Sequence, residues 1–377
     1  MIDSKTMLDA ELVKTAVRRE ELAEKLGIVA RAVSTRTSVL VLGGIQLRAG
    51  DGRLDLAGTD MELSLRTSLE AQVDGEGTMV VPGRLLLDIV RSLPRSEVEI
   101  AHRSEEGLVT IASGSATYRV HTYPSEDFPR LPELAAGESE PIEAGVLLET
   151  IARVARAASR DESRPVLTGI LVRFEGDKVV MAATDSYRLA VKETPSSSRL
   201  PELEAIIPAR ALQELARIAG SAEDVRIGLQ ENHVLFAAAG TWLTTRRIDG
   251  QFPSYRQLLP DRFEHEVTLP REELLDAVRR VALMAQRNTP LRLRLAEGEL
   301  TVSAQTPDVG EARESLPAPF AAEPLEIGFN AEFLRDGLES IDSPTLRMKL
   351  ISPLRPVVLE GETADYTYLI MPIRLAG

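Results

Sequence analysis

Two aspartates, Asp60 and Asp185, lie at matching Thr-Asp positions in the similar strings LAGTDMELSL and AATDSYRLAV. Two carboxylates held close together could act as the general acid and general base of a hydrolase or transferase. The third related string reads AQTPD, and an aspartate that recurs where a strand ends is more often a turn-former or a cap. We therefore interpret both aspartates as structural residues.

Other residues that commonly perform catalysis or bind metals are scarce. The 377 residues include no Cys and four scattered His, which excludes disulfides and thiolate chemistry and leaves few nitrogen ligands for a metal. The sequence also lacks the glycine-rich phosphate loops, paired-histidine helices and serine elbows of common enzyme families. We expect no metal site, no cofactor and no catalytic residue, and a carboxylate-dependent enzyme ranks as a distant alternative.

The sequence is built from repeats, which must position whatever functional residues it has. The helical string VARAV at 29–33 recurs as VARAA at 154–158 and, less closely, as RVALMA at 280–285. Each copy precedes two alternating strands joined by a glycine-containing turn, as in β-hairpins. These turns are Asp51-Gly52, Gly176-Asp177 and Gly298-Glu299.

A second helix follows in each copy, after a Pro or Asn that favours a helix start. The three strings are MVVPGRLLLDIVRSL, AIIPARALQELARIA and EIGFNAEFLRDGLESI, and more alternating strands follow each of them. Each third of the chain therefore predicts two βαβββ units, and the fold class is α+β.

Two Pro-rich stretches mark the domain boundaries. The dipeptide Phe-Pro occurs in both, at Phe128 and at Phe252, 124 residues apart. This spacing predicts three tandem domains at 12–131, 132–260 and 261–377. No apolar run reaches the roughly 20 residues of a membrane span and the N-terminus lacks the pattern of a signal peptide, so we expect a cytoplasmic protein without a membrane partner.

The charge distribution is uneven. The net charge of −14 would normally argue against nucleic acid as a partner. The six predicted helical stretches nevertheless carry +3 together, and arginines recur at matched places, as with Arg84 and Arg210 or Arg91 and Arg217. We interpret the set as a mildly basic face for a polyanion, although any one of these arginines could be an ordinary solvated residue. The stretches are 20–36, 82–95, 146–164, 208–220, 270–287 and 329–341.

Several strings together carry a resemblance to a known family. They are STRTSVLVLGGIQL, LAGTDMELSL, VLTGILVRF, AATDSYRLAV, FPSYRQLLP and the C-terminal YTYLIMPIRL. Over essentially its whole length the chain resembles the bacterial DNA polymerase sliding clamp, the β subunit of the replicative polymerase. The resemblance implies a non-catalytic processivity factor for DNA replication that forms a ring as a head-to-tail homodimer, with six domains and twelve helices around a central hole.

The resemblance also implies that the ring encircles duplex DNA without reading its sequence. Weak contacts to phosphates would let such a ring slide, whereas strong contacts would slow it. The positions that match the DNA-facing basic residues of the family are Arg36, Arg84, Arg91, Arg164, Arg210 and Arg217.

A second implied activity is docking of the replicative polymerase, the clamp loader and repair proteins. In the family a short linear peptide of each partner enters an apolar pocket between the second and third domains. In the family, His is frequent at the position of Tyr187, and Arg is frequent at the position of Gln257. Which partners the pocket prefers is therefore an open question at these two positions. The matching pocket positions are Leu167, Thr184, Tyr187, Arg188, Leu189, Pro253, Leu258, Asn330, Phe333, Leu354, Pro356, Ile370, Met371, Pro372, Ile373 and Arg374.

For the contact between subunits, the resemblance points to two segments. Tyr118 and Val120 would lie on an edge strand of the first domain and meet Leu283 and Met284 on a helix of the third. The main alternative is an interaction scaffold of clamp-like fold that does not encircle DNA. The retained arginines and interface residues favour the clamp.

Overall fold

The computed structural model describes residues 12–34, 37–133, 139–197, 200–285 and 289–375. The chain divides into two compact units. One unit holds the chain up to Pro141 together with Arg217–Arg246, and the other holds Ile142–Ala216 together with Arg247–Gly377.

The same succession of elements occurs three times, each time as two βαβββ units. The first copy consists of β1 (Leu12–Arg18), α1 (Arg19–Val29), β2 (Gly44–Gly50), β3 (Arg53–Thr59), β4 (Leu63–Glu70), a short β5 (Gln72–Asp74), β6 (Gly77–Pro82), α2 (Gly83–Ser92), β7 (Glu97–Arg103), β8 (Leu108–Ser113) and β9 (Ala116–His121). The predicted order of strands and helices is therefore confirmed for this copy.

The second and third copies repeat this order. The second consists of β10 (Ser139–Glu143), α3 (Ala144–Val154), a one-turn helix α4 (Pro165–Thr168), β11 (Gly169–Glu175), β12 (Lys178–Thr184), β13 (Arg188–Pro195), β14 (Leu203–Pro208), α5 (Ala209–Ile218), β15 (Asp224–Leu229), β16 (His233–Ala238) and β17 (Thr241–Arg246). The third consists of β18 (His265–Pro270), α6 (Arg271–Val281), β19 (Leu291–Ala296), β20 (Glu299–Thr306), β21 (Gly310–Pro317), β22 (Leu325–Phe329), α7 (Ala331–Ser340), β23 (Thr345–Leu350), β24 (Val357–Glu360) and β25 (Tyr366–Ile370).

Antiparallel sheets run across the junctions between copies, because β17 pairs with β4 and β13 pairs with β25. The first unit contains the sheet β5-β1-β7-β8-β9 and most of the sheet β10-β15-β16-β17-β4-β3-β2-β6. The second unit contains the sheets β14-β11-β12-β13-β25-β24-β23-β18 and β21-β20-β19-β22. The middle copy shares one sheet with each neighbour, and its residues are divided between the two compact units.

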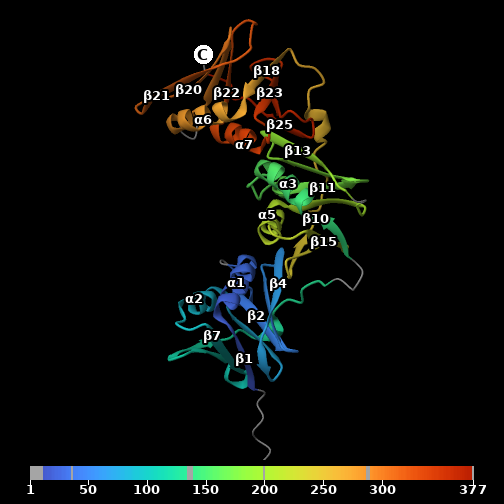
Figure 1. The fold of residues 1–377 in the computed structure, drawn as a ribbon, viewed down its shortest axis with the longest axis vertical. Coiled ribbons are helices and arrows are strands. Elements are labelled where there is room, and N and C mark those ends of the chain that lie inside the picture. The colour runs from blue at the N-terminus through green and yellow to red at the C-terminus, as the bar shows by residue number, and fades with distance from the viewer. Residues whose placement is uncertain (1–11, 35–36, 134–138, 198–199, 286–288, 376–377) are drawn as a thin grey trace, which may run out of the picture. The chain divides into compact units, whose positions relative to one another are not determined.

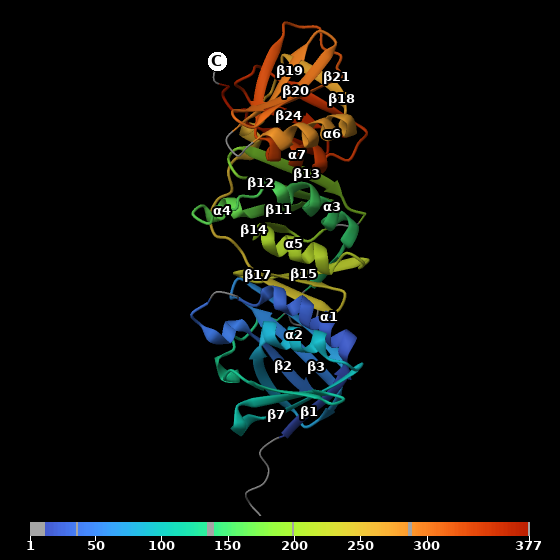
Figure 2. The same ribbon diagram turned by 90° about the vertical axis from the view of Figure 1, so that its left-hand side faces the viewer.

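The helices bury one apolar stripe each against these sheets. In α1 the buried residues Leu22, Leu26 and Val29 follow the helical spacing of three and four, and α1 lies beside α2. In the third copy α6 and α7 also lie side by side (Figure 1), as the second view shows as well (Figure 2). Each copy thus has two helices, as the two-unit repeat predicts, and the structure adds that they lie side by side in the first and third copies.

Three predicted helices end well before their predicted C-terminal residue. The stretch 270–287 is helical only to Val281, followed by the 3-10 turn Ala282–Met284. The stretch 20–36 is helical only to Val29, and the stretch 146–164 only to Val154, each followed by a single 3-10 turn. Past the turns after α1 and α3 the backbone is extended and closes a loop between residues eight positions apart: Ser34 N donates to Leu42 O at 2.9 Å, and Ser159 N donates to Leu167 O at 2.8 Å. These loop-closing bonds take the place of the next helical ones. The third hairpin turn also differs from the prediction, because it is Glu297-Gly298.

After the last strand of each copy, the chain makes one backbone bond to the edge strand of a sheet. Tyr123 N donates to Val80 O at 2.8 Å, Ile248 N to Ile206 O at 2.9 Å, and Ile373 N to Gly328 O at 2.8 Å. In the first two copies the chain then reaches the matching Phe-Pro dipeptides. Phe128 packs with Val41, Leu42, Ala57 and Val80, and Phe252 packs with Leu171, Ile206 and Leu189 among others. The prediction that the two dipeptides are equivalent points is confirmed.

Gly337 offers a direct test of how closely α7 packs on β25. A Cβ at this position would lie 2.5 Å from two ring carbons of Tyr368, a fully buried side chain. We expect Gly337→Ala to lower the free energy of unfolding by about 1–3 kcal/mol, because the core has no room for the methyl group. Denaturant unfolding measures this, with Gly145→Ala in α3 as the control, where the nearest atom is 4.0 Å away. Equal stability of the two variants would contradict the prediction.

Candidate DNA-facing and partner-binding surfaces

A tight turn between β12 and β13 presents Tyr187 to solvent. Asp185 Oδ1 accepts hydrogen bonds from Tyr187 N at 2.9 Å and Arg188 N at 3.0 Å, and Thr184 Oγ1 donates to Arg188 O at 2.6 Å. Ser186 has a φ of +80°. Asp60 accepts backbone bonds in the same way in the first copy, at 3.1 and 2.9 Å, so the structural interpretation of both aspartates is confirmed.

The C-terminal segment joins this turn to the third copy. Arg188 pairs with Ile370 in the β13–β25 register, and Met371 N then donates to Tyr187 O at 2.8 Å. Two residues later, Ile373 forms an isolated antiparallel bridge with Gly328 beside β22. The C-terminal string therefore runs from the sheet that the second and third copies share to the sheet β21-β20-β19-β22 of the third copy.

Beneath the turn, Arg188 is held by two carboxylates. Its side chain is only 6% exposed, with Nε 3.0 Å from Asp185 Oδ2 and Nη1 2.6 Å from Asp336 Oδ2 on α7. Nη2 donates to the carbonyl of Arg156. Burial disfavours the charged guanidinium, but the phenol of Tyr368 and the two carboxylates outweigh burial and raise the pKa of Arg188. This cation is fixed in place and stays charged.

The guanidinium of Arg188 supports an aromatic residue of the surface. Its Cζ lies 4.2 Å from the ring centroid of Phe333, and the Phe333 ring stacks on that of Tyr187 at 6.5 Å. Asn330 caps α7 by accepting the Phe333 N–H at 3.1 Å, and Tyr368 donates its hydroxyl to Phe333 O at 2.8 Å. Phe333 is therefore fixed through its backbone as well as its ring.

Four predicted residues are brought together in this way: Tyr187, Phe333, Met371 and Ile373, which we call the partner surface. Clusters of large apolar side chains that are exposed to solvent commonly mark binding sites. Among the described residues of the second unit, seven large apolar side chains are exposed, and five of them are predicted partner-binding positions. These five are Tyr187 (60% exposed), Leu258 (50%), Leu354 (58%), Met371 (40%) and Ile373 (41%).

The other predicted positions lie on neighbouring elements. Leu167 is in α4, Leu258 ends the 3-10 turn Tyr255–Leu258, and Leu354 and Pro356 lie in the connection from β23 to β24. Thr184, Arg188, Leu189 and Ile370 are buried and so support the surface, whereas Pro253 and Arg374 are exposed and Pro372 is half-buried. The predicted set thus divides into exposed side chains and the buried residues that hold them.

A group of ionic residues around Arg188 was missed by sequence reasoning. Arg156 Nη1 is ion-paired with Glu339 and lies 3.5 Å from Asp336 Oδ1, and Arg279 Nη2 lies 2.9 Å from Glu339 Oε1. Arg153 forms a separate ion pair with Asp342 at 2.6 Å. The partners are up to 189 residues apart in the chain, and no local pattern connects them, so only the fold could reveal the network.

The predicted DNA-facing arginines fall into three groups. Arg84 and Arg91 on α2, and Arg210 and Arg217 on α5, are exposed, and each pair is separated by two helical turns and so shares a helix face. Arg36 lies outside the described residues. The expectation that Arg164 continues a helix is wrong: it lies in the turn before α4, where its Nε is 3.0 Å from Asp161 Oδ2.

The predicted subunit-contact residues also divide by exposure. Tyr118 and Val120 lie on β9, which is the edge strand of its sheet, but Val120 is buried and Tyr118 is 39% exposed. Leu283 and Met284 lie in the 3-10 turn Ala282–Met284 that follows α6, and Leu283 is 81% exposed. An exposed strand edge and an exposed leucine are surfaces that commonly need covering.

The described residues contain no group of three or more His, Asp or Glu that could hold a metal ion. In the same part of the chain, every helix falls short of the length and apolarity that crossing a membrane requires. The surfaces above are thus the features to compare with known proteins.

Three family models match the chain in succession: the DNA polymerase III beta subunit N-terminal domain at 13–132, central domain at 141–254 and C-terminal domain at 256–374. The beta sliding clamp of Streptomyces coelicolor is 38% identical over 97% of this chain and 100% of its own length. The solved sliding clamp of Bacillus subtilis has a TM-score of 0.90 at 27% identity, covering 97% of this chain and 100% of that one. The Pseudomonas aeruginosa clamp, solved bound to griselimycin, has a TM-score of 0.86 at 29% identity, covering 96% and 100%. The chain therefore belongs to the DNA polymerase III beta subunit family, the family of the beta sliding clamps.

Proposed function

We propose that two copies of this chain close head to tail into a cytoplasmic, non-catalytic ring of six domains, at 12–131, 132–260 and 261–377 in each copy. The open edge of β9 and the exposed Leu283 support a contact between copies. A heterologous contact of this kind closes when the rotation between subunits permits. Three equal domains per chain fit such a closed ring.

The ring would surround duplex DNA and slide along it. Four exposed arginines recur on α2 and α5 at the same seven-residue spacing, which supports a weakly basic helical face. The chain as a whole carries −14, so DNA would be repelled elsewhere. Few phosphate contacts and no base readout leave the ring free to move.

The ring would tether the replicative polymerase, the clamp loader and repair proteins through short peptides. The observation that carries this proposal is the partner surface, where large apolar side chains stay exposed above a rigid ionic support. Met and aromatic side chains adapt to different peptides, as a shared docking site requires. The Pseudomonas aeruginosa relative, solved bound to griselimycin, adds support that a clamp of this family holds a ligand.

The test is topological. The protein is loaded by its cognate loader onto a nicked circular duplex, washed in high salt, and the circle is then cut at one site. We expect nearly complete retention before the cut and nearly complete loss afterwards, because a ring can leave only over a DNA end. Gel filtration of the DNA with labelled protein measures both fractions.

An uncut circle carried through the same steps is the control. The mass of the free protein should also be about twice the 41.2 kDa of one chain. Encirclement would be contradicted if high salt removed the protein before the cut, or if the protein stayed on the DNA after the cut. A strict monomer at micromolar concentration would contradict ring closure.

A further inference from the structure

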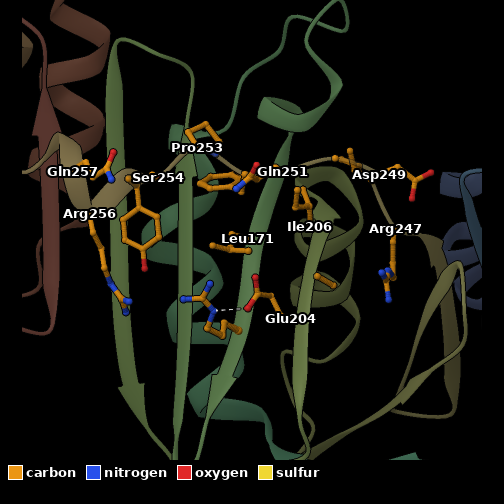
Figure 3. Close-up of a pocket in the computed structure, with 16 residues that line it drawn as sticks. Leu171, Glu204, Ile206, Arg247, Asp249, Gln251, Pro253, Ser254, Arg256 and Gln257 are labelled. Carbon is orange, nitrogen blue, oxygen red and sulfur yellow. Dashed lines mark hydrogen bonds and ion pairs between the residues drawn. The ribbon is translucent and has the colours of Figure 1, made fainter.

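The segment Arg247–Gln257, which links the second copy to the third, covers a cavity of about 480 Å³. Figure 3 shows this segment crossing the strands, with Leu171 and Ile206 on the sheet below it. We call the cavity the linker groove. It is lined by Pro253, a predicted partner-binding position, and by Gln257, so it adjoins the partner-binding region without containing the partner surface itself.

The floor of the linker groove is apolar. Leu171, Ile206 and Phe252 belong to one buried cluster and all three line the cavity. Lower in the groove, Arg173 Nε lies 2.9 Å from Glu204 Oε2, drawn as a dashed line in Figure 3. The hydrogen bond that Arg173 donates to the Glu204 carboxylate raises the pKa of Arg173, and the two charges compensate each other. The floor can thus accept an apolar side chain without leaving a buried charge unpaired.

The two ends of the groove carry cations. In Figure 3 Arg256 lies at one side and Arg247 at the other, with the apolar floor between them. Arg247 is exposed and makes no ion pair with any residue that the structure describes, and the carboxylate of Asp249 points away from it in Figure 3. Arg256 is 62% exposed and reaches only 3.7 Å from Glu175. On a protein of net charge −14, two exposed guanidiniums flanking an apolar floor favour an acidic ligand.

We propose that the linker groove is a second docking site, for an extended acidic peptide segment that carries one apolar side chain. The apolar side chain would lie over Leu171 and Ile206, and flanking carboxylates would pair with Arg247 and Arg256. The source of such a segment is a partner protein held at the neighbouring partner surface. The identity of the partner protein rests on the proposed function. The binding of an acidic peptide does not, because it depends only on the floor and the charges of the linker groove.

The test uses the full-length protein and the synthetic peptide Asp-Glu-X-Asp-Glu, where X is the photo-crosslinking residue p-benzoylphenylalanine. We expect crosslinks within Arg247–Gln257 or at the floor residues, mapped by mass spectrometry after proteolysis. The double variant Arg247→Ala/Arg256→Ala should weaken apparent binding roughly 2- to 10-fold at low ionic strength, as expected for losing two exposed ion pairs. Added salt should weaken binding to the unaltered protein in the same direction.

Arg294→Ala is the matched control, because Arg294 is an exposed, unpaired arginine on β19 of the same unit within the described chain. A peptide with Lys at the four acidic positions should not crosslink. The proposal is overturned if that peptide crosslinks equally well, if the double variant binds like the control, or if the crosslinks map elsewhere. The variant Tyr187→Ala/Met371→Ala should leave this crosslink unchanged, so failure of the groove and failure of the partner surface are separate results.

Discussion

The double variant Tyr187→Ala/Met371→Ala is expected to lose at least about 100-fold in affinity for a peptide of the cognate replicative polymerase. Tyr187 and Met371 are 60% and 40% exposed, and Met371 N donates to Tyr187 O at 2.8 Å, so the two side chains belong to one surface. Exposed aromatic and Met side chains at the centre of an interface commonly supply most of its binding energy. Isothermal titration of the peptide into each protein measures the loss.

Val309→Ala controls for the removal of an exposed apolar side chain. Val309 is 55% exposed in the turn between β20 and β21 of the same unit and is not part of the partner surface. Its variant should bind the peptide as the unaltered protein does. Because all three side chains are exposed, the thermal unfolding midpoints should remain similar. Peptide affinity within about twofold of normal in the double variant would rule out the partner surface as the main docking site.

Asp336→Asn is expected to lower the free energy of unfolding by about 3 kcal/mol, the low end of the range for breaking a buried ion pair. Asp336 Oδ2 lies 2.6 Å from Arg188 Nη1, and the two side chains are 11% and 6% exposed. The amide leaves Arg188 with Asp185 as its remaining carboxylate, at 3.0 Å, so part of the buried charge loses its compensation. Denaturant unfolding with an unchanged m-value would measure this loss directly.

Asp342→Asn is the matched control for this prediction. Asp342 Oδ2 also lies 2.6 Å from an arginine, Arg153 Nη2, but the Asp342 side chain is 83% exposed. Exposed pairs contribute roughly 0–1 kcal/mol, so the variant should be nearly as stable as the unaltered protein. If both variants lost the same free energy of unfolding, the burial of Arg188 would not explain the loss in Asp336→Asn. Partner peptides should bind Asp336→Asn more weakly, because Arg188 supports Phe333.

The ionic network gives the partner surface a rigid base. Arg188 connects the turn that presents Tyr187 to α7, which carries Phe333 and Asp336. Buried charges of this kind seldom increase stability over apolar packing, but they fix one arrangement of the groups that hold them. Apolar groups that are already ordered lose less entropy on binding, which suits the proposed binding of short peptides.

Much of the fold followed from local patterns in the sequence. Alternating apolar residues around Asp51-Gly52 predicted a hairpin, and both turn residues have positive φ values, of 48° and 70°. Pro82 and Asn330 correctly marked the starts of α2 and α7. These features depend on interactions between residues a few positions apart, which the sequence displays directly.

The candidate site was predictable only in part. The partner-binding residues came from resemblance to a family, and the structure adds which of them are exposed and which hold the others. Arg164 shows the limit of pattern reasoning: the stretch 146–164 was predicted as one helix, but the helix ends at Val154 and a loop closed by the bond from Ser159 N to Leu167 O follows. The linker groove had no signal in the sequence, because its floor and its covering segment come from different elements.

The threefold repeat, the two βαβββ units of each copy and the positions of most turns could be predicted from the sequence, since spacing and turn chemistry are local. No local pattern predicts that β13 pairs with β25 or that Arg188 contacts Asp336, 148 residues away. Both depend on which distant segments pack together, and the stabilising terms, backbone pairing and burial of charge, exist only after that packing. The repeat thus supplies three similar domains. The partner surface lies at the junction between the second domain and the third.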